Sequence, residues 1–306
     1  MKSSLPHLVI AATAALAFAF ASLGANAAEL TGRLKTIKER NTITVAYRES
    51  SIPFSYLGGN GQPIGYAQDI CQKIVEDVKA AIGSPDLVVK RQAVTSQNRI
   101  PLIQNGTIDL ECGTTVNNPE RQALVSFSTT YFVVGTKFVS RKADRLATLQ
   151  DLKGKTVVAT TGSNTVMRLR GIDRKEGLNL NLIQAKDFSD SMLTFTSGRA
   201  DAFFEDDINL VGQISFSLNP ADFTLSTDTL SRDPYAVMLP RGEPEFKAVA
   251  DKTIARLFAS GEIRALYDKW FQSPIPPRGV NLRFPMSDAL VKVIAKPTDS
   301  PNPSDY

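Results

Sequence analysis

The chain has 306 residues, of which 42% are hydrophobic and 22% are charged. This is the composition of a globular protein with enough apolar residues for two modest domains, and it excludes a chain that is mostly disordered. The net charge of +4 is distributed without any run of five basic residues, which argues against a nucleic-acid-binding protein.

The N-terminal segment has the layout of a secretory signal peptide. Lys2 gives a basic start, residues 8–23 form an apolar run, and Ala25–Ala27 is a small-x-small cleavage motif. A membrane anchor is the alternative, but the run is short for a membrane span and ends at small residues. We therefore expect residues 1–27 to be removed and the protein to be periplasmic.

Removal of this segment changes the chemistry open to the protein. It lowers the net charge to +3 and takes away the only histidine, His7, so the remaining 279 residues contain none. This excludes Ser-His-Asp and Cys-His catalysis and any histidine-ligated metal site. We expect no catalytic residues, no metal and no cofactor.

The first half of the chain alternates helical and strand patterns. From Ile70 to Ile82, apolar residues recur at every third or fourth position between charged ones, which predicts an amphipathic helix packed on a sheet. The other predicted elements are a helix over 31–40, strands over 43–47, 86–94 and 108–113, and a short helix with Pro101 in its first turn. Together they predict a βαβαβ unit.

The same alternation restarts downstream. The predicted elements are a helix over 146–153, a strand over 156–160, a helix from Asn164, a strand over 178–184, a helix over 188–197 and a strand over 201–206. Two successive α/β units predict two lobes with a cleft between them.

Two extended segments would connect these lobes. Residues 130–139 lie between the two units and residues 233–240 follow the second, which predicts a two-stranded hinge. The expected lobes are residues 28–133, then 134–235, then a return to the first lobe over 236–306. That return contains a predicted long helix over 244–271 and a tail from Ser273 that lies over lobe one, with its last ten residues frayed.

The state of the two cysteines stays open. Cys71 and Cys112 can form one disulfide in an oxidising compartment. Two buried free thiols are equally compatible, because Cys71 falls on an apolar helix face and Cys112 in a strand.

Charged residues follow several of the predicted strands. In an open parallel sheet, ligands bind beyond the carboxyl ends of the strands. Arg48, Arg99 and Arg121 follow strands of the first unit, and the acidic residues 205–207 end the second. Guanidinium groups suit carboxylates and a carboxylate suits an ammonium, so this set fits a zwitterion with an additional carboxylate. Each arginine alone would be an ordinary surface ion-pair partner, so the joint placement carries the hypothesis.

A set of sequence blocks in and around these strand ends is typical of one protein family. The blocks are Thr95–Leu102, Gln104–Thr107, Glu111–Thr115, Asn117–Asn118 with Glu120–Gln122, Phe127–Ser128, Ala265–Phe271 and Pro274–Pro277. With them the chain resembles the glutamate/aspartate-binding periplasmic proteins of ABC uptake systems, in solute-binding protein family 3. The resemblance covers nearly all of the chain after residue 27. It implies an α/β, two-lobed periplasmic-binding-protein fold of type II, with a two-stranded hinge and a ligand cleft between the lobes.

The resemblance also implies roles for individual residues. Arg121 is expected to hold the ligand α-carboxylate, with Thr114 and the backbone around Val116, and Asp206 is expected to receive the ammonium. The residues expected around the side-chain carboxylate, and in the loop that closes from lobe two, are Arg48, Ser96, Arg99, Ser163 and Asn164.

Two positions depart from the family pattern. Val116 stands where a small hydroxyl residue is expected, so only a backbone contact is left there. Phe188 stands where this branch carries a histidine. The loss of that donor would weaken binding of aspartate or glutamate, or shift preference toward a larger or amidated side chain.

The implied function is capture of an acidic L-amino acid and its delivery to an ABC permease by a monomeric protein. The alternatives are a binder of glutamine or asparagine, a dehydratase-like enzyme on the same fold, and a sensor module. The absence of histidine argues against the enzyme and predicts little change of affinity between about pH 6 and 8.

Overall fold

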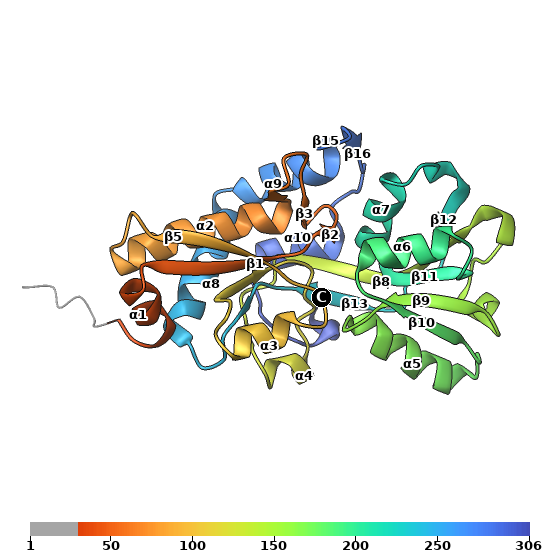
Figure 1. Ribbon diagram of the computed structural model, residues 1–306, viewed down its shortest axis with the longest axis horizontal. Helices are drawn as coiled ribbons and strands as arrows, with labels where there is room; N and C mark the ends of the chain where they lie inside the picture. Colours follow the sequence, from red (N-terminus) through yellow and green to blue (C-terminus); the bar gives the residue numbers. More distant parts are fainter. Residues whose placement is uncertain (1–29) are drawn as a thin grey trace, which may run out of the picture. The chain divides into compact units, whose positions relative to one another are not determined.

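The computed structural model describes residues 30–306, and Thr31–Tyr306 forms one compact unit (Figure 1). The predicted signal segment and His7 lie outside the described residues. Two main sheets organise this unit, with strand orders β5-β1-β6-β14-β7 and β10-β9-β11-β8-β12.

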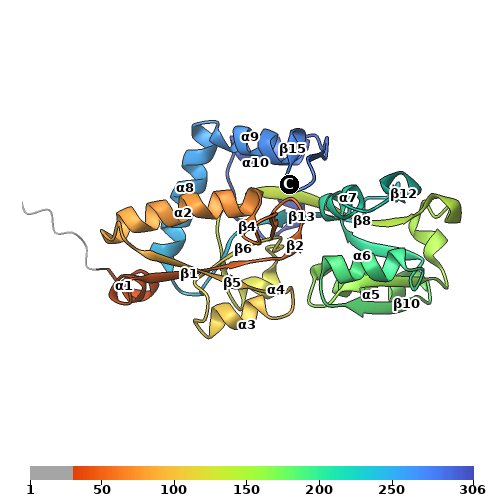
Figure 2. The same cartoon turned by 45° about the horizontal axis from the view of Figure 1, so that its top comes forward.

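The first sheet contains the predicted βαβαβ unit. β1 pairs in parallel with both β5 and β6, whereas β14 is antiparallel to β6 and to β7. Figure 2 shows α2, α8 (Pro244–Ala259) and α9 (Glu262–Tyr267) on one side of this sheet, and α3 and α4 on the other. The bounds are α1 Gly32–Glu39, β1 Thr42–Tyr47, α2 Tyr66–Ile82, β5 Val88–Ala93, α3 Arg99–Gln104, β6 Leu110–Cys112, α4 Pro119–Gln122, β7 Ser126–Phe127 and β14 Met238–Leu239.

A small three-stranded sheet precedes α2 and was not predicted. Its strands are β2 Ser50–Ser51, β3 Ser55–Leu57 and β4 Pro63–Ile64. They are two or three residues long, too short to produce a periodic pattern.

The second sheet contains the second α/β unit. β9 lies between the parallel strands β10 and β11, and β8 pairs antiparallel with β11 and β12. The bounds are β8 Phe132–Arg141, β9 Thr156–Thr160, α5 Asn164–Glu176, β10 Asn181–Ala185, α6 Phe188–Thr196, β11 Ala202–Asp206, α7 Asp207–Ser215 and β12 Phe223–Leu225. The strand and helix patterns from 156 to 206 are therefore confirmed, while α7 and β12 are additional.

The helix predicted over 146–153 is wrong. This stretch contains only the 3₁₀ turn Leu149–Leu152, after the shorter turn Lys142–Asp144. A capping box formed by Thr148 and Asp151 starts the turn, and Lys153 already leaves it with an extended ψ of 124°. Only four residues lie between the N-cap Thr148 and Lys153, which is too few for a second helical turn.

The two connections between the sheets pair with one another. β13, Arg232–Tyr235, runs antiparallel to β8, with Arg232 opposite Gly135 and Tyr235 opposite Phe132. β8 continues into the second sheet, and the chain after β13 returns to the first sheet as β14. The predicted two-stranded hinge and the two-lobed α/β fold class are confirmed.

The predicted long helix over 244–271 is divided. α8 spans Pro244–Ala259, α9 spans Glu262–Tyr267, and a π-helical turn follows over Asp268–Gln272. Gly261 separates the two helices with a φ of 76°. This left-handed conformation is one that glycine adopts without a steric penalty, and it ends α8.

The C-terminal tail is ordered, so the expectation of a frayed end is wrong. The Tyr306 hydroxyl lies 2.7 Å from Thr130 Oγ1, and Arg232 donates to the Tyr306 carbonyl at 3.0 Å. Both Thr130 and Arg232 lie at the hinge, so the chain end is fixed beside it; the label C in Figure 1 marks this position. The tail also contains β15 Pro274–Ile275, β16 Val280–Asn281, α10 Asp288–Ala295 and the 3₁₀ turn Pro303–Asp305, and another such turn lies earlier, over Pro220–Asp222.

The two cysteines form a disulfide. Cys71 on α2 and Cys112 on β6 are bonded, with their Cα atoms 6.1 Å apart. The alternative of two free thiols is wrong. The bond fixes the long amphipathic helix to the strand that leads into the candidate site.

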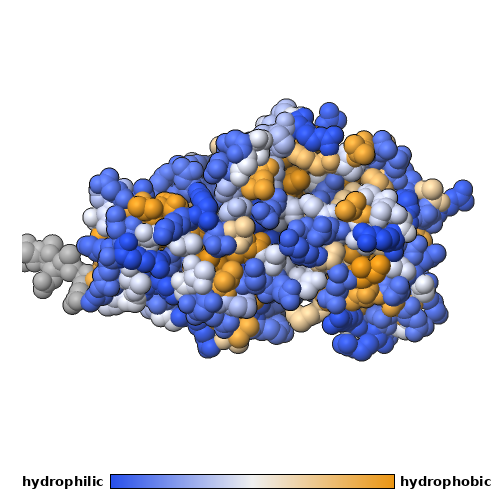
Figure 3. Space-filling view, viewed as in Figure 1, coloured by the Kyte–Doolittle hydropathy of each residue, from blue (hydrophilic) through white to orange (hydrophobic). Residues whose placement is uncertain are grey.

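The described part of the chain contains no helix that is long and apolar enough to cross a membrane. In Figure 3, apolar side chains on the visible face form separate patches among hydrophilic ones.

Candidate ligand-binding site

Three buried arginines lie beyond the strands of the first sheet. Arg48 directly follows β1, Arg99 opens α3 and Arg121 lies in α4, with exposed fractions of 1%, 2% and 6%. Buried guanidinium groups are costly unless anions or carbonyl oxygens compensate them. Their partners therefore show what the site can accept.

Arg48 has two side-chain nitrogens, Nη1 and Nη2, that are buried without a hydrogen-bond partner. Its guanidinium carbon lies 5.0 Å from the centre of the Phe188 ring, which belongs to α6 in the other lobe. Burial, together with the nearby charge of Arg99, lowers the pKa of Arg48 to about 10, so the group is still a cation at neutral pH.

Arg99 is only partly compensated. Its Nη1 donates to the Thr114 carbonyl at 3.2 Å and lies 4.0 Å from Glu111 Oε1, whereas its Nε has no partner. The neighbouring Ser96 hydroxyl is also buried without a partner. Glu111 was missed as a site residue, although a carboxylate between the apolar neighbours Leu110 and Cys112 in a buried strand is a signal that could have found it.

Arg121 connects the two lobes. Its Nη1 donates to the Val116 carbonyl at 2.9 Å, and its Nη2 donates to the carbonyl of Gly162, in the loop before α5, at 3.4 Å. Asn118 caps α4 by accepting from the Arg121 N–H, and its Nδ2 donates to Asn164 Oδ1 at 3.1 Å. Burial, together with the charge of Arg99, lowers the pKa of Arg121 to about 9.

The acidic side of the site is a buried pair at the end of β11. Asp206 accepts hydrogen bonds from the Tyr235 hydroxyl and from Thr136 Oγ1, the latter at 3.2 Å. Glu205 accepts from Thr165 Oγ1 and from the Asp206 N–H, both at 3.1 Å. Burial raises the pKa of both carboxyls, and for Asp206 the charge of Glu205 raises it further.

Tyr235 and Thr136 were not predicted as site residues. They lie on the paired hinge strands, so the hinge itself positions the carboxylate of Asp206. No local sequence pattern marks either residue, because their role depends on the pairing of segments about 100 residues apart.

The other predicted residues lie around this frame. Thr114 Oγ1 donates to Ser51 Oγ at 3.5 Å, and Ser163 Oγ lies 2.6 Å from Thr165 Oγ1. Ser163 is therefore linked through Thr165 to Glu205. In the described residues, no group of three or more cysteine, aspartate or glutamate side chains is arranged to hold a metal ion.

Residues 43–273 match the family model described as bacterial extracellular solute-binding proteins, family 3. The chain belongs to this family. This family 3 protein is similar to curated relatives. It is 48% identical over 272 residues to an L-glutamate/L-aspartate-binding protein of Pseudomonas aeruginosa, and the aligned residues cover 89% of this chain and 90% of the relative. It is 43% identical over 298 residues to a glutamate/aspartate import solute-binding protein of Salmonella typhimurium, covering 97% of both chains.

Solved structures of amino-acid-binding proteins have the same fold. An arginine-binding protein mutant from T. maritima has a TM-score of 0.69 and 25% identity, covering 78% of this chain and 99% of its own. An ancestral amino-acid-binding protein described as a precursor of cyclohexadienyl dehydratase has a TM-score of 0.67 and 22% identity, covering 78% and 99%. The second likeness shows the fold alone.

Proposed function

We propose that this family 3 protein captures an acidic L-amino acid outside the cytoplasm and delivers it to an ABC-type permease. One observation carries the proposal. Of eight buried side-chain atoms without a partner among residues 30–306, four are donors in this site: Arg48 Nη1 and Nη2, Arg99 Nε and Ser96 Oγ. Unpaired buried donors on two cations favour an anionic ligand.

Each charged group of the ligand would face a protein group of the opposite charge. Arg121 and Thr114 would hold the α-carboxylate beside the Val116 carbonyl, and Asp206 would hold the ammonium. Arg48, Ser96 and Arg99 would hold the side-chain carboxylate, and Ser163 and Asn164 would close from lobe two. Each charge-assisted hydrogen bond contributes about 1.5–3 kcal/mol, which supports affinity in the micromolar range or tighter.

The unpaired guanidinium of Arg48 favours a carboxylate over an amide. A glutamine or asparagine side chain would be neutral and would leave this buried cation without a directly hydrogen-bonded anion. The Phe188 side chain has no hydrogen-bonding group that could pair with Arg48 in place of a ligand carboxylate. The names of the curated relatives support the same ligand class.

Closure of two lobes over the ligand would couple binding to transport. A ligand that contacts Arg121 in one lobe and Asp206 in the other binds the closed form better and therefore increases its population. The closed form would dock on the permease. In this proposal the mature protein is a periplasmic monomer of residues 28–306 that catalyses no reaction. One lobe consists of residues 28–133 and 236–306, and the other consists of residues 134–235.

The substitution Arg121→Ala tests the proposal. We expect calorimetry to show no binding of L-glutamate or L-aspartate by this variant. The control is Arg256→Ala, which removes an arginine of α8 whose Nη2 donates to Asp77 Oδ2 on α2 at 2.8 Å. Unchanged glutamate affinity in Arg121→Ala would overturn the assignment of the site.

A further inference from the structure

A second region of contact between the lobes lies outside the residues proposed to bind the ligand. We call it the α7 seam: Gly212, Gln213 and Phe216, in and directly after α7, face Ser50, Ile52 and Tyr56 in the β2–β3 segment. The two sides belong to different lobes, because α7 lies between β11 and β12 of the second sheet and β2–β3 lies between β1 and α2.

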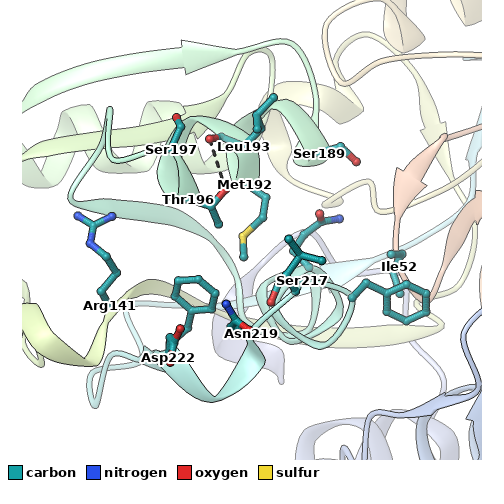
Figure 4. A pocket seen from close by; sticks show the side chains of 14 residues that line it. Ile52, Arg141, Ser189, Met192, Leu193, Thr196, Ser197, Ser217, Asn219 and Asp222 are labelled. Carbon is teal, nitrogen blue, oxygen red and sulfur yellow. Dashed lines mark hydrogen bonds between the residues drawn. The ribbon is translucent and has the colours of Figure 1, made fainter.

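Three kinds of contact form the α7 seam. Gln213 Nε2 donates to the Ser50 carbonyl at 2.7 Å. The Phe216 and Tyr56 rings meet edge to face with their centres 6.2 Å apart. A cavity of about 750 Å³ runs along the seam, and Figure 4 shows Ile52, which directly follows β2, across from the α6 residues Met192 and Leu193 on the other wall.

The closest approach is at Gly212. A Cβ atom at this position would lie 2.3 Å from the Ile52 carbonyl oxygen and 3.0 Å from its carbonyl carbon and Cβ, and these are its three nearest neighbours. Real Cβ atoms are not found that close to a carbonyl oxygen. Gly212 lies inside a helix, where the backbone conformation suits any L-residue, so the approach of Ile52 is what requires glycine here.

We infer that Gly212 is a positioning residue that allows the lobes to close far enough to hold a ligand at both ends. The inference rests on the proposed function. Ile52 lies four residues after Arg48, and Gly212 lies six residues after Asp206. The α7 seam therefore fixes the spacing between the group that would bind the side-chain carboxylate and the group that would bind the ammonium.

The substitution Gly212→Ala tests this role in the full mature chain. A methyl group would separate α7 from Ile52, so a smaller fraction of the protein would reach the closed form, and the apparent dissociation constant would rise by at least about tenfold. The melting temperature of the ligand-free protein should stay the same or rise, because alanine favours the helix. A purely structural role would lower that temperature instead.

Gly171→Ala is the matched control. Gly171 also lies inside a helix of the second lobe, in α5, but nothing lies within 4 Å of the position of its Cβ. We expect its dissociation constant to stay within about twofold of wild type. A second seam variant, Gln213→Ala, removes the bond to Ser50 and should weaken binding several-fold.

The measurement is a calorimetric titration with L-glutamate, or with whichever amino acid the wild-type chain binds in a thermal-shift screen. Affinity of Gly212→Ala equal to wild type would overturn the inference, as would a fall in its melting temperature together with the affinity. Failure of the wild-type chain to bind acidic amino acids would instead contradict the proposed function. The two results are therefore distinguishable.

Discussion

The guanidinium carbon of Arg48 lies 5.0 Å from the centre of the Phe188 ring, across the boundary between the two lobes. An aromatic face attracts a cation without consuming any of its N–H donors. Phe188 can therefore hold the side chain of Arg48 in place while Nη1 and Nη2 stay available to a carboxylate. The family pattern predicts the loss of a hydrogen-bond donor at Phe188, whereas in the structure its ring contacts the guanidinium of Arg48.

The ring of Phe188 should contribute to affinity. Phe188→Leu keeps an apolar side chain in the core of lobe two but removes the aromatic face below Arg48. We expect the binding free energy for L-glutamate to weaken by about 0.5–2 kcal/mol, measured by calorimetry.

Phe195→Leu is the matched control for this substitution. Phe195 lies on the same helix and in the same hydrophobic cluster, and its ring lies 5.2 Å from the guanidinium carbon of Arg141, away from the site. Both variants should lose stability, but only Phe188→Leu should lose affinity. Equal affinities in the two variants would remove Phe188 from the site.

Binding should release a proton through Asp206. Burial and the charge of Glu205 raise the pKa of this carboxyl well above its ordinary value, so in the ligand-free protein it keeps its proton to a higher pH than an exposed aspartate does. An ammonium group beside it favours the carboxylate and lowers that pKa. Affinity should therefore rise as pH rises toward the raised pKa, whereas the absence of histidine alone predicts little pH dependence between about pH 6 and 8.

Calorimetry in two buffers of different ionisation enthalpy measures this release. Over a series of pH values, we expect the observed heats to differ between the two buffers of a pair where the ligand-free carboxyl still holds its proton, and the difference to vanish in Asp206→Asn. Identical heats for the wild-type protein in both buffers would show that Asp206 does not change its protonation.

The disulfide should contribute substantially to stability. Cys71 and Cys112 are 41 residues apart in the sequence, and closing a loop of that length stabilises a fold by about 4 kcal/mol in the chain-entropy treatment. The free energy of unfolding in urea should fall by about 2–4 kcal/mol in Cys71→Ala/Cys112→Ala. Wild-type protein unfolded with a reducing agent should show a similar loss; no loss in either experiment would contradict the prediction.

The C-terminal tyrosine should stabilise the hinge. Tyr306 donates to the Ser300 carbonyl at 2.7 Å, so Thr130, which is fully buried, donates to the Tyr306 hydroxyl. Tyr306→Phe leaves the Thr130 hydroxyl unpaired, and we expect the free energy of unfolding to fall by about 1–3 kcal/mol. The double variant Tyr306→Phe/Thr130→Val should lose less free energy of unfolding than the sum of the losses in the two single variants. Strict additivity would show that the two hydroxyls are not coupled.

Local patterns predicted those parts of the fold whose signals are local. The periodic apolar residues of α2 and the β-branched strands produce patterns within a few residues, and strand order alone brought Arg48, Arg99 and Arg121 to one edge. The division of the long C-terminal helix depends on a left-handed conformation at Gly261, which composition indicates only weakly.

The features that were missed depend on contacts between distant segments. Tyr235 reaches Asp206 because β13 pairs with β8, and Tyr306 is ordered because the distant residues Thr130 and Arg232 lie next to it in space. The contact between Gly212 and Ile52 joins residues 160 positions apart. The sequence contains each residue, but their distances are set by how the two lobes meet.

A titration of the mature protein with four ligands tests the central claim most directly. The protein would first be unfolded and refolded to remove any carried ligand, and then titrated with L-glutamate, L-aspartate, L-glutamine and L-asparagine in a calorimeter. The unpaired guanidinium of Arg48 predicts that at least one dicarboxylate binds in the micromolar range or tighter, and that its amide binds at least about tenfold more weakly. An amide that binds as tightly as its acid would contradict the account.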